Sequence, residues 1–130
     1  MLLVGQLGAG KTTFVQGVAV GLGVDERVTS ATFTMVRQHE CHNDLGITTL
    51  HHADVYRVAT LDEVRDLDLG ELVEESGVAL VEWGDLAASI YGRDVLTVEF
   101  TLTELDSRTL VVAGALSETR RDELDAWAAS

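Results

Sequence analysis

The stretch GQLGAGKTT, Gly5 to Thr13, lies near the start of this 130-residue chain and decides its fold. Together Gly5, Gly10, Lys11 and Thr12 fill every fixed position of the phosphate-binding pattern G-x-x-x-x-G-K-[ST]. Glycines let the backbone curl so that several N–H groups point at one anion, and the helix N-terminus adds the positive end of its dipole. The pattern therefore predicts a cradle for phosphate, followed directly by a helix.

The residues that flank this loop have the pattern that a phosphate cradle requires. Met1 to Val4 form a short apolar run that indicates a buried strand. Apolar residues recur at helical spacing from Phe14 to Leu22, and the glycines around that end favour a helix stop. Lys11 is the single lysine of the chain, and we expect it to reach nucleotide phosphates while the Thr12 hydroxyl binds Mg²⁺. The alternative is an incidental glycine turn before an ordinary helix.

Composition and charge limit the classes of protein to which this chain can belong. Hydrophobic residues make up 46% and charged residues 24%, which predicts a single folded domain over residues 1–130. No apolar run reaches the roughly 18 residues of a membrane-spanning helix, and the apolar start lacks the basic residues of a signal peptide. The net charge of −13 disfavours strong direct binding to nucleic acid. The lack of a membrane span and of a signal peptide predicts a cytoplasmic protein, and the single cysteine agrees with a reducing compartment.

The rest of the chain alternates between strand-like and helix-like segments. Gly77 to Glu82 is almost wholly apolar up to its carboxylate, which is typical of a central strand buried on both faces. Thr60 and Glu63 have the spacing of a capping box and predict a helix that reaches about Leu69. This order predicts an α/β fold of the P-loop NTPase type, with a mixed, mainly parallel sheet, flanking helices and a C-terminal antiparallel hairpin. The other predicted segments are strands over Thr32 to Glu40, Ile47 to Ala53, Val95 to Thr103 and Ser107 to Ala113, a loop over His42 to Gly46, and a last helix from Ser117 toward Trp127.

Two carboxylates are candidates for the acidic half of the site. Asp54 follows the strand over Ile47 to Ala53, and Glu82 ends the strand that begins at Gly77. In parallel α/β sheets ligands gather at the carboxyl ends of strands, so both side chains should lie near Thr12. Mg²⁺ takes oxygen ligands and the attacking water must be oriented, which are tasks that carboxylates perform. The alternative for either residue is a solvated acid at a strand edge.

Four segments in order, GQLGAGKTT, VTSATFT, HADVYR and VEWG, resemble the TsaE family, small P-loop ATPases of bacterial tRNA threonylcarbamoyladenosine synthesis. The resemblance covers roughly Val4 to Gly84, and the last two segments are far more specific than the loop alone. It implies Mg-dependent ATP hydrolysis, weak in isolation, that acts as a switch on the complex making N6-threonylcarbamoyladenosine at position 37 of tRNA. The implied partners are TsaB- and TsaD-like proteins. A small-molecule P-loop kinase and a nucleotide-gated binding module without turnover are the alternative functions.

The resemblance also implies roles for particular residues. Asp54 and Glu82 would be catalytic, and Thr12, Asp54 and Glu82 would bind the metal. Trp83 would border the site, and residues 28–34 would sense the γ-phosphate. The ATP-binding residues implied in this way are Gly8, Ala9, Gly10, Lys11, Thr12, Thr13, Thr32 and Trp83.

Two departures from the family pattern bear on these expectations. Ala31 stands where the family usually has proline, so the segment VTSATFT lacks one fixed φ angle. Only Met1 to Val4 precede the phosphate loop, whereas the family has a further strand and helix there. We therefore expect this N-terminal strand and helix to be missing. Their loss should weaken the stability of the fold and the binding of the nucleotide base more than it weakens the phosphate contacts.

The remaining polar motifs carry weaker signals. His52 belongs to HADVYR, and it either orients Asp54 or serves as a buried structural histidine. Arg57 could contact phosphate or pair with nearby acids. His39 and Cys41 are of types that bind metals, but the spacing of the stretch HECH matches no zinc pattern and favours a solvated loop.

Overall fold

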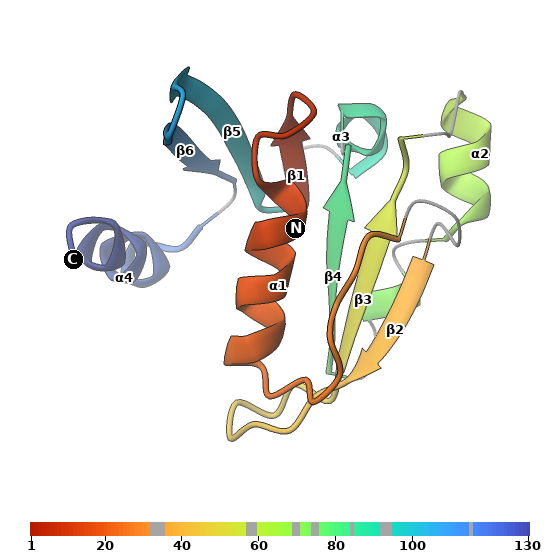
Figure 1. Ribbon diagram of the computed structural model, residues 1–130. Coiled ribbons are helices and arrows are strands. Elements are labelled where there is room, and N and C mark those ends of the chain that lie inside the picture. Colours follow the sequence, from red (N-terminus) through yellow and green to blue (C-terminus); the bar gives the residue numbers. More distant parts are fainter. Residues whose placement is uncertain are drawn as a thin grey trace.

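A six-stranded sheet with helices against both of its faces forms the body of the protein (Figure 1). The computed structural model describes residues 1–31, 36–56, 60–68, 71–73, 76–83, 85–91, 95–114 and 116–130. The strands follow one another across the sheet in the order β2-β3-β4-β1-β5-β6. Their bounds are β1 Leu2–Gly5, β2 Val36–Glu40, β3 Thr49–Asp54, β4 Gly77–Glu82, β5 Thr97–Glu104 and β6 Ser107–Ala113. The helices are α1 Lys11–Gly21, α2 Leu61–Asp66, the 3-10 helix η1 Glu71–Val73, α3 Asp85–Tyr91 and α4 Glu118–Ala128.

The four inner strands of the sheet run parallel, and each edge strand is antiparallel to its neighbour. β1 pairs in parallel with both β4 and β5, while β3 pairs in parallel with β4. The register places Leu3 beside Glu82 and Asp54 beside Glu82. The carboxyl ends of β1, β3 and β4 therefore meet at one edge of the sheet. This topology confirms the predicted fold class, including the C-terminal antiparallel hairpin of β5 and β6.

Successive side chains of β4 pack in two separate hydrophobic cores, one on each face of the sheet. Leu80 packs in a cluster with Leu3 of β1 and Val15 of α1 on one face of the sheet. Val81 packs on the other face in a cluster that contains Val64 of α2 and Ala87 of α3. Successive side chains of a strand point to opposite faces, which is why an almost continuous apolar strand is needed between two helical layers. The predicted central strand is thereby confirmed with the bounds Gly77–Glu82.

Helix ends follow the chemistry expected from the sequence. The predicted capping box at α2 is present, because the Thr60 hydroxyl accepts a hydrogen bond from the Glu63 N–H and the Glu63 carboxylate accepts one from the Thr60 N–H. Ser117 caps α4 by accepting a hydrogen bond from the Arg120 N–H. α4 contains no buried residue and lies beside β6 at one end of the molecule (Figure 1). Within the described ranges, no helix is long and apolar enough to cross a membrane.

Some predicted bounds and environments need correction. α2 ends at Asp66 instead of near position 69, and the 3-10 helix and α3 were not predicted. The first four residues of the predicted strand from Thr32 to Glu40 lie outside the described residues. The solvated loop expected for HECH is wrong for its first residues. His39 lies in β2 and is 3% exposed, and its Nδ1 atom lies 2.5 Å from the Glu26 carboxylate. Cys41 is also buried.

Gly23 makes a backbone contact that no other residue could make at the end of α1. Its φ angle is +71°, and a Cβ atom there would lie 1.9 Å from the carbonyl oxygen of His42. The His42 N–H in turn donates to the Gly23 carbonyl. We expect Gly23→Ala to lower the free energy of unfolding by more than about 1 kcal/mol, since both the φ angle and the close contact oppose a side chain. Urea denaturation measures this loss.

Gly17 provides the matched control for this substitution. It is exposed in the middle of α1, and no atom lies within 4 Å of its Cβ position. Alanine has the higher helix propensity, so Gly17→Ala should raise the free energy of unfolding by about 0.5 to 1 kcal/mol. Equal effects of the two substitutions would contradict the close contact at Gly23.

Candidate functional site

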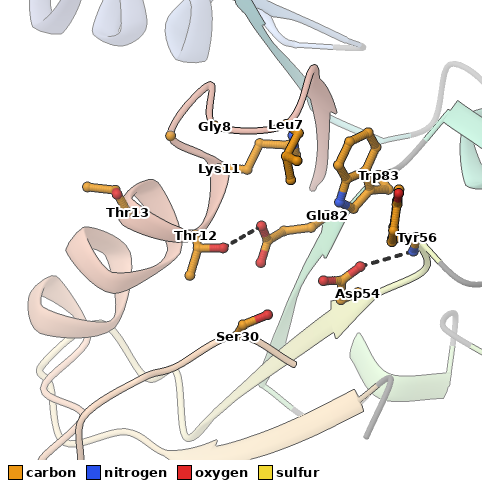
Figure 2. A pocket seen from close by; sticks show the side chains of 11 residues that line it. Leu7, Gly8, Lys11, Thr12, Thr13, Ser30, Asp54, Tyr56, Glu82 and Trp83 are labelled. Atoms are coloured by element: carbon orange, nitrogen blue, oxygen red, sulfur yellow. Dashed lines mark hydrogen bonds between the residues drawn. The ribbon is translucent and has the colours of Figure 1, made fainter. Parts of the chain in front are cut away.

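The phosphate loop forms the connection between β1 and α1 at the carboxyl edge of the sheet (Figure 2). Gly10 occupies the N-cap position of α1 with a φ angle of +105°, and no side chain caps this helix. No atom lies within 4 Å of the Cβ position of Gly10, so the helix N-terminus opens onto free space. Backbone N–H groups in the first turn of an uncapped helix are available to an anion. Ala9 is placed differently, because it is buried in the core and its N–H donates to the Gln6 carbonyl within the loop.

Lys11 is a buried cation held against the loop. Its Nζ atom donates hydrogen bonds to the carbonyl oxygens of Gly5 and Gln6, at 2.6 Å and 2.9 Å. The same atom lies 4.0 Å from the centre of the Trp83 ring, a cation–π contact. Burial lowers the pKa of Lys11 from its ordinary value, and the nearby carboxylates of Glu82, Asp54 and Asp85 act in the opposite direction. Two neutral carbonyl oxygens and the face of the Trp83 ring therefore hold the lysine in place.

Glu82 connects the loop to the sheet through both of its carboxylate oxygens. The Thr12 hydroxyl donates to Oε1 at 2.7 Å (Figure 2), and Nε2 of His52 lies 2.5 Å from Oε2. Glu82 is 3% exposed and His52 is fully buried. Of the two roles expected for His52, the structure therefore supports a buried, hydrogen-bonded histidine, whose partner is Glu82 instead of Asp54. Because the hydroxyl proton of Thr12 is used on Glu82, its oxygen lone pairs remain for a cation.

Asp54 lies beside Glu82 at the end of β3, as the sequence predicted. It is 6% exposed, and one of its carboxylate oxygens accepts a hydrogen bond from the Tyr56 N–H at 3.0 Å. The Tyr56 ring packs against Trp83 with the ring centres 4.7 Å apart. Trp83 has a φ angle of +60°, a conformation that is uncommon outside glycine and that often occurs at functional sites. The two aromatic rings form one wall next to the carboxylates (Figure 2).

These side chains surround a cavity of 330 Å³. The structure brings together most of the predicted site residues there, except for Ala9 in the core and for Thr32, which lies outside the described residues together with Arg57. Sequence reasoning missed two lining residues, Leu7 and Tyr56, although each lies in a recognised motif, whereas Ser30 belongs to the segment 28–34 that was expected to sense the γ-phosphate. The position of Leu7 and Tyr56 in these motifs was the signal that could have identified them as lining residues. The lining residues are Leu7, Gly8, Gly10, Lys11, Thr12, Thr13, Ser30, Asp54, Tyr56, Glu82 and Trp83.

The oxygen atoms of this cavity suit Mg²⁺ held jointly with a phosphate. In the part of the chain that the structure describes, no group of three or more His, Cys, Asp or Glu residues could hold a metal ion by itself. The cavity instead offers the Thr12 hydroxyl and the carboxylates of Asp54 and Glu82. Mg²⁺ typically takes one or two protein carboxylates and completes its shell with water and substrate phosphates. The donor set therefore fits a cation that arrives with a nucleotide.

The hydrogen bond between Thr12 and Glu82 should contribute measurably to the free energy of unfolding. Thr12→Val keeps the shape of the side chain but leaves Oε1 of the buried Glu82 without this donor. We expect the free energy of unfolding to fall by roughly 1 to 3 kcal/mol, the usual cost of an unsatisfied buried polar group. Thr13→Val, at the exposed neighbouring position, should change it by less than about 0.5 kcal/mol. Urea denaturation measures the free energy of unfolding of both variants. Similar losses in the two would contradict the hydrogen bond between Thr12 and Glu82.

Known proteins resemble this chain over most of its length. Residues 1–110 match the family model TsaE, described as threonylcarbamoyl adenosine biosynthesis protein TsaE. The tRNA threonylcarbamoyladenosine biosynthesis protein TsaE of Treponema pallidum (strain Nichols) is 39% identical over 113 residues, which cover 87% of this chain and 80% of that protein. The protein of the same name from Bacillus subtilis (strain 168) is 49% identical over 86 residues, which cover 66% of this chain and 51% of that protein.

A solved structure shares the fold. The crystal structure of YdiB from Bacillus subtilis superposes with a TM-score of 0.60 at 33% sequence identity, covering 96% of this chain and 73% of that chain. The match spans only about half the length of some relatives, 51% of the Bacillus subtilis protein and 56% of the one from Streptomyces coelicolor. From the family match and these relatives, the chain belongs to the TsaE family of tRNA threonylcarbamoyladenosine biosynthesis proteins.

Proposed function

We propose that this protein binds ATP with Mg²⁺ in the cavity between α1 and the carboxyl ends of β3 and β4, and hydrolyses it in support of tRNA threonylcarbamoyladenosine synthesis. The hydrogen bond between Thr12 and Glu82 carries the proposal, because it joins the phosphate loop to a buried acid across the cavity. A glycine turn that merely began a helix would have no need of such a partner. Membership of the TsaE family supplies the biological context.

The cradle residues would bind and orient the nucleotide phosphates. The open N-terminus of α1 presents backbone N–H groups and the positive end of the helix dipole. Lys11 would exchange its bonds with the Gly5 and Gln6 carbonyls for phosphate oxygens, a favourable exchange because bonds between charged partners are the stronger ones. Bound Mg²⁺ would neutralise charge on the phosphate oxygens. Thr12 would hold that cation through its free lone pairs.

The two carboxylates would serve the metal and the attacking water. Glu82 is fixed at both oxygens by donors, and Asp54 is fixed at one oxygen by the Tyr56 N–H. A carboxylate with a free lone pair can orient a water molecule by accepting its proton in a hydrogen bond. A carboxylate has about four acceptor positions, so the hydrogen bonds named here do not by themselves prevent either acid from accepting another.

We further propose that hydrolysis is weak in the isolated chain and is stimulated by TsaB- and TsaD-like partners, on which the protein acts as a switch. The net charge of −13 supports association with a basic patch on one of them. Such association is steered by unscreened charge, so it should weaken as the salt concentration rises.

Phosphate release in the presence of the two partners tests the proposal. The native chain should release phosphate from ATP faster with the partners than alone. Asp54→Asn and Glu82→Gln should each lower this rate by roughly 100-fold or more, as loss of a general base does, while ATP affinity changes less than about tenfold, or 1.4 kcal/mol.

Glu99→Gln is the matched control, because Glu99 is an exposed acid on β5 outside the cavity lining. It should leave both the rate and the affinity unchanged. Absence of stimulation by the partners would contradict the proposed hydrolysis and favour a nucleotide-gated module. Equal losses of affinity and rate in the Asp54 and Glu82 variants would show that these acids only maintain the fold.

A further inference from the structure

We propose that His52 is a positioning residue that holds the Glu82 carboxylate between the phosphate loop and the sheet. The inference rests on the proposed ATP and Mg²⁺ site, because it assigns a task to a residue directly behind one of the acids of that site. His52 is fully buried and is absent from the cavity lining, so its effect on the site would pass through Glu82.

The strand register explains why this histidine reaches this glutamate. In the parallel pair of β3 and β4, Asp54 lies beside Glu82 and His52 lies beside Leu80. Side chains two residues apart on a strand share a face, so His52 and Asp54 point to the same side of β3. From there His52 spans diagonally to β4, where its Nε2 atom lies 2.5 Å from Oε2 of Glu82.

The position of the proton follows from the partner. An ionised carboxylate can only accept hydrogen bonds, so Nε2 of His52 must be the donor. The other ring nitrogen, Nδ1, is buried and has no hydrogen-bond partner in the described part of the protein. The hydrogen bond to Glu82 therefore places a proton on Nε2 of His52.

Both oxygens of Glu82 need to be held because the ammonium group of Lys11 could also attract this carboxylate. Lys11 and Glu82 carry opposite charges and line the same cavity. Without His52, only the Thr12 hydroxyl would hold the carboxylate, and its free end could turn toward the Lys11 ammonium. That turn would neutralise the charge that the phosphates require and remove an oxygen from the proposed cation site. The hydrogen bond from His52 to Oε2 prevents this rotation of the Glu82 carboxylate.

A second histidine with the same local chemistry provides a control. His39 is also buried, pairs with a carboxylate through one ring nitrogen, and has its other ring nitrogen without a partner in the described residues. Its partner is Glu26, and neither residue lines the cavity. A substitution at His39 therefore reports the general cost of removing a buried histidine, separately from any effect on Glu82.

The experiment compares His52→Gln, His52→Asn and His39→Gln with the native chain; glutamine does not reproduce Nδ1, the atom through which His39 pairs with Glu26. The amide nitrogen of glutamine lies about as far from Cα as Nε2 of histidine, so glutamine can still donate to Glu82, whereas asparagine is one bond too short. Calorimetry with Mg²⁺ and with EDTA gives the factor by which Mg²⁺ tightens ATP binding. Phosphate release with the partners gives the turnover rate.

We expect His52→Asn to reduce the Mg²⁺ factor and the turnover rate by roughly 10- to 100-fold, the usual effect of losing a residue that orients a metal-binding group. His52→Gln should retain most of both quantities, and His39→Gln should leave both unchanged. Equal losses in the glutamine and asparagine variants, or an unchanged Mg²⁺ factor in a folded His52→Asn variant, would overturn the inference.

Failure of the inference can be told apart from failure of the proposed function. A native chain that binds Mg-ATP without turnover contradicts the proposed hydrolysis, but the Mg²⁺ factor still tests His52. A native chain that binds no nucleotide contradicts both. If His52→Asn does not fold, imidazole ¹⁵N NMR of the native chain takes the place of that variant as the test. The His52 signals are identified by their absence from the spectrum of His52→Gln. The proton is expected on Nε2, and a proton on Nδ1 alone would overturn the inference.

Discussion

The hydrogen bond from the Thr12 hydroxyl to the Glu82 carboxylate connects two parts of the chain that are 70 residues apart. It requires that α1 begin at the carboxyl edge of β1, and that β4 end at the same edge. The parallel pairing of β1 with β4 and of β4 with β3 meets both conditions and brings Asp54 to the same place. Because the cavity lies where these elements converge, its geometry depends on the sheet register as much as on the loop.

Charge balance explains why such a cavity would take phosphate together with a cation. Of the lining residues that the structure describes, Lys11 carries the positive charge, while Asp54 and Glu82 are acids. Two unit charges 4 Å apart interact by about 4 kcal/mol at an effective dielectric constant near 20, so bare phosphates beside two carboxylates would meet strong repulsion. A divalent cation between these groups turns repulsion into attraction, and the available oxygen donors suit Mg²⁺. The acids and the phosphate loop would thus be complementary to a nucleotide that brings a divalent cation with it.

Much of this arrangement could be predicted from local patterns. The phosphate loop, the apolar run of β4 and the capping box of α2 are each encoded within a few neighbouring residues, and so the structure reproduces them. The placement of Asp54 next to Glu82 followed from a general rule about the carboxyl ends of parallel strands. The pairing of His52 with Glu82 did not follow, because these residues are 30 positions apart in the sequence and meet only through the exact register of β3 and β4. The burial of His39 was missed for a similar reason, since its partner Glu26 comes from a distant loop.

Calorimetric titration of Mg-ATP into the native chain and into Lys11→Ala tests the central claim most directly. The account predicts that the native chain binds ATP and that the variant loses most of this affinity, because Lys11 supplies the positive charge among the described residues of the cavity. Equal affinity in a folded Lys11→Ala variant, or no binding by the folded native chain, would contradict it.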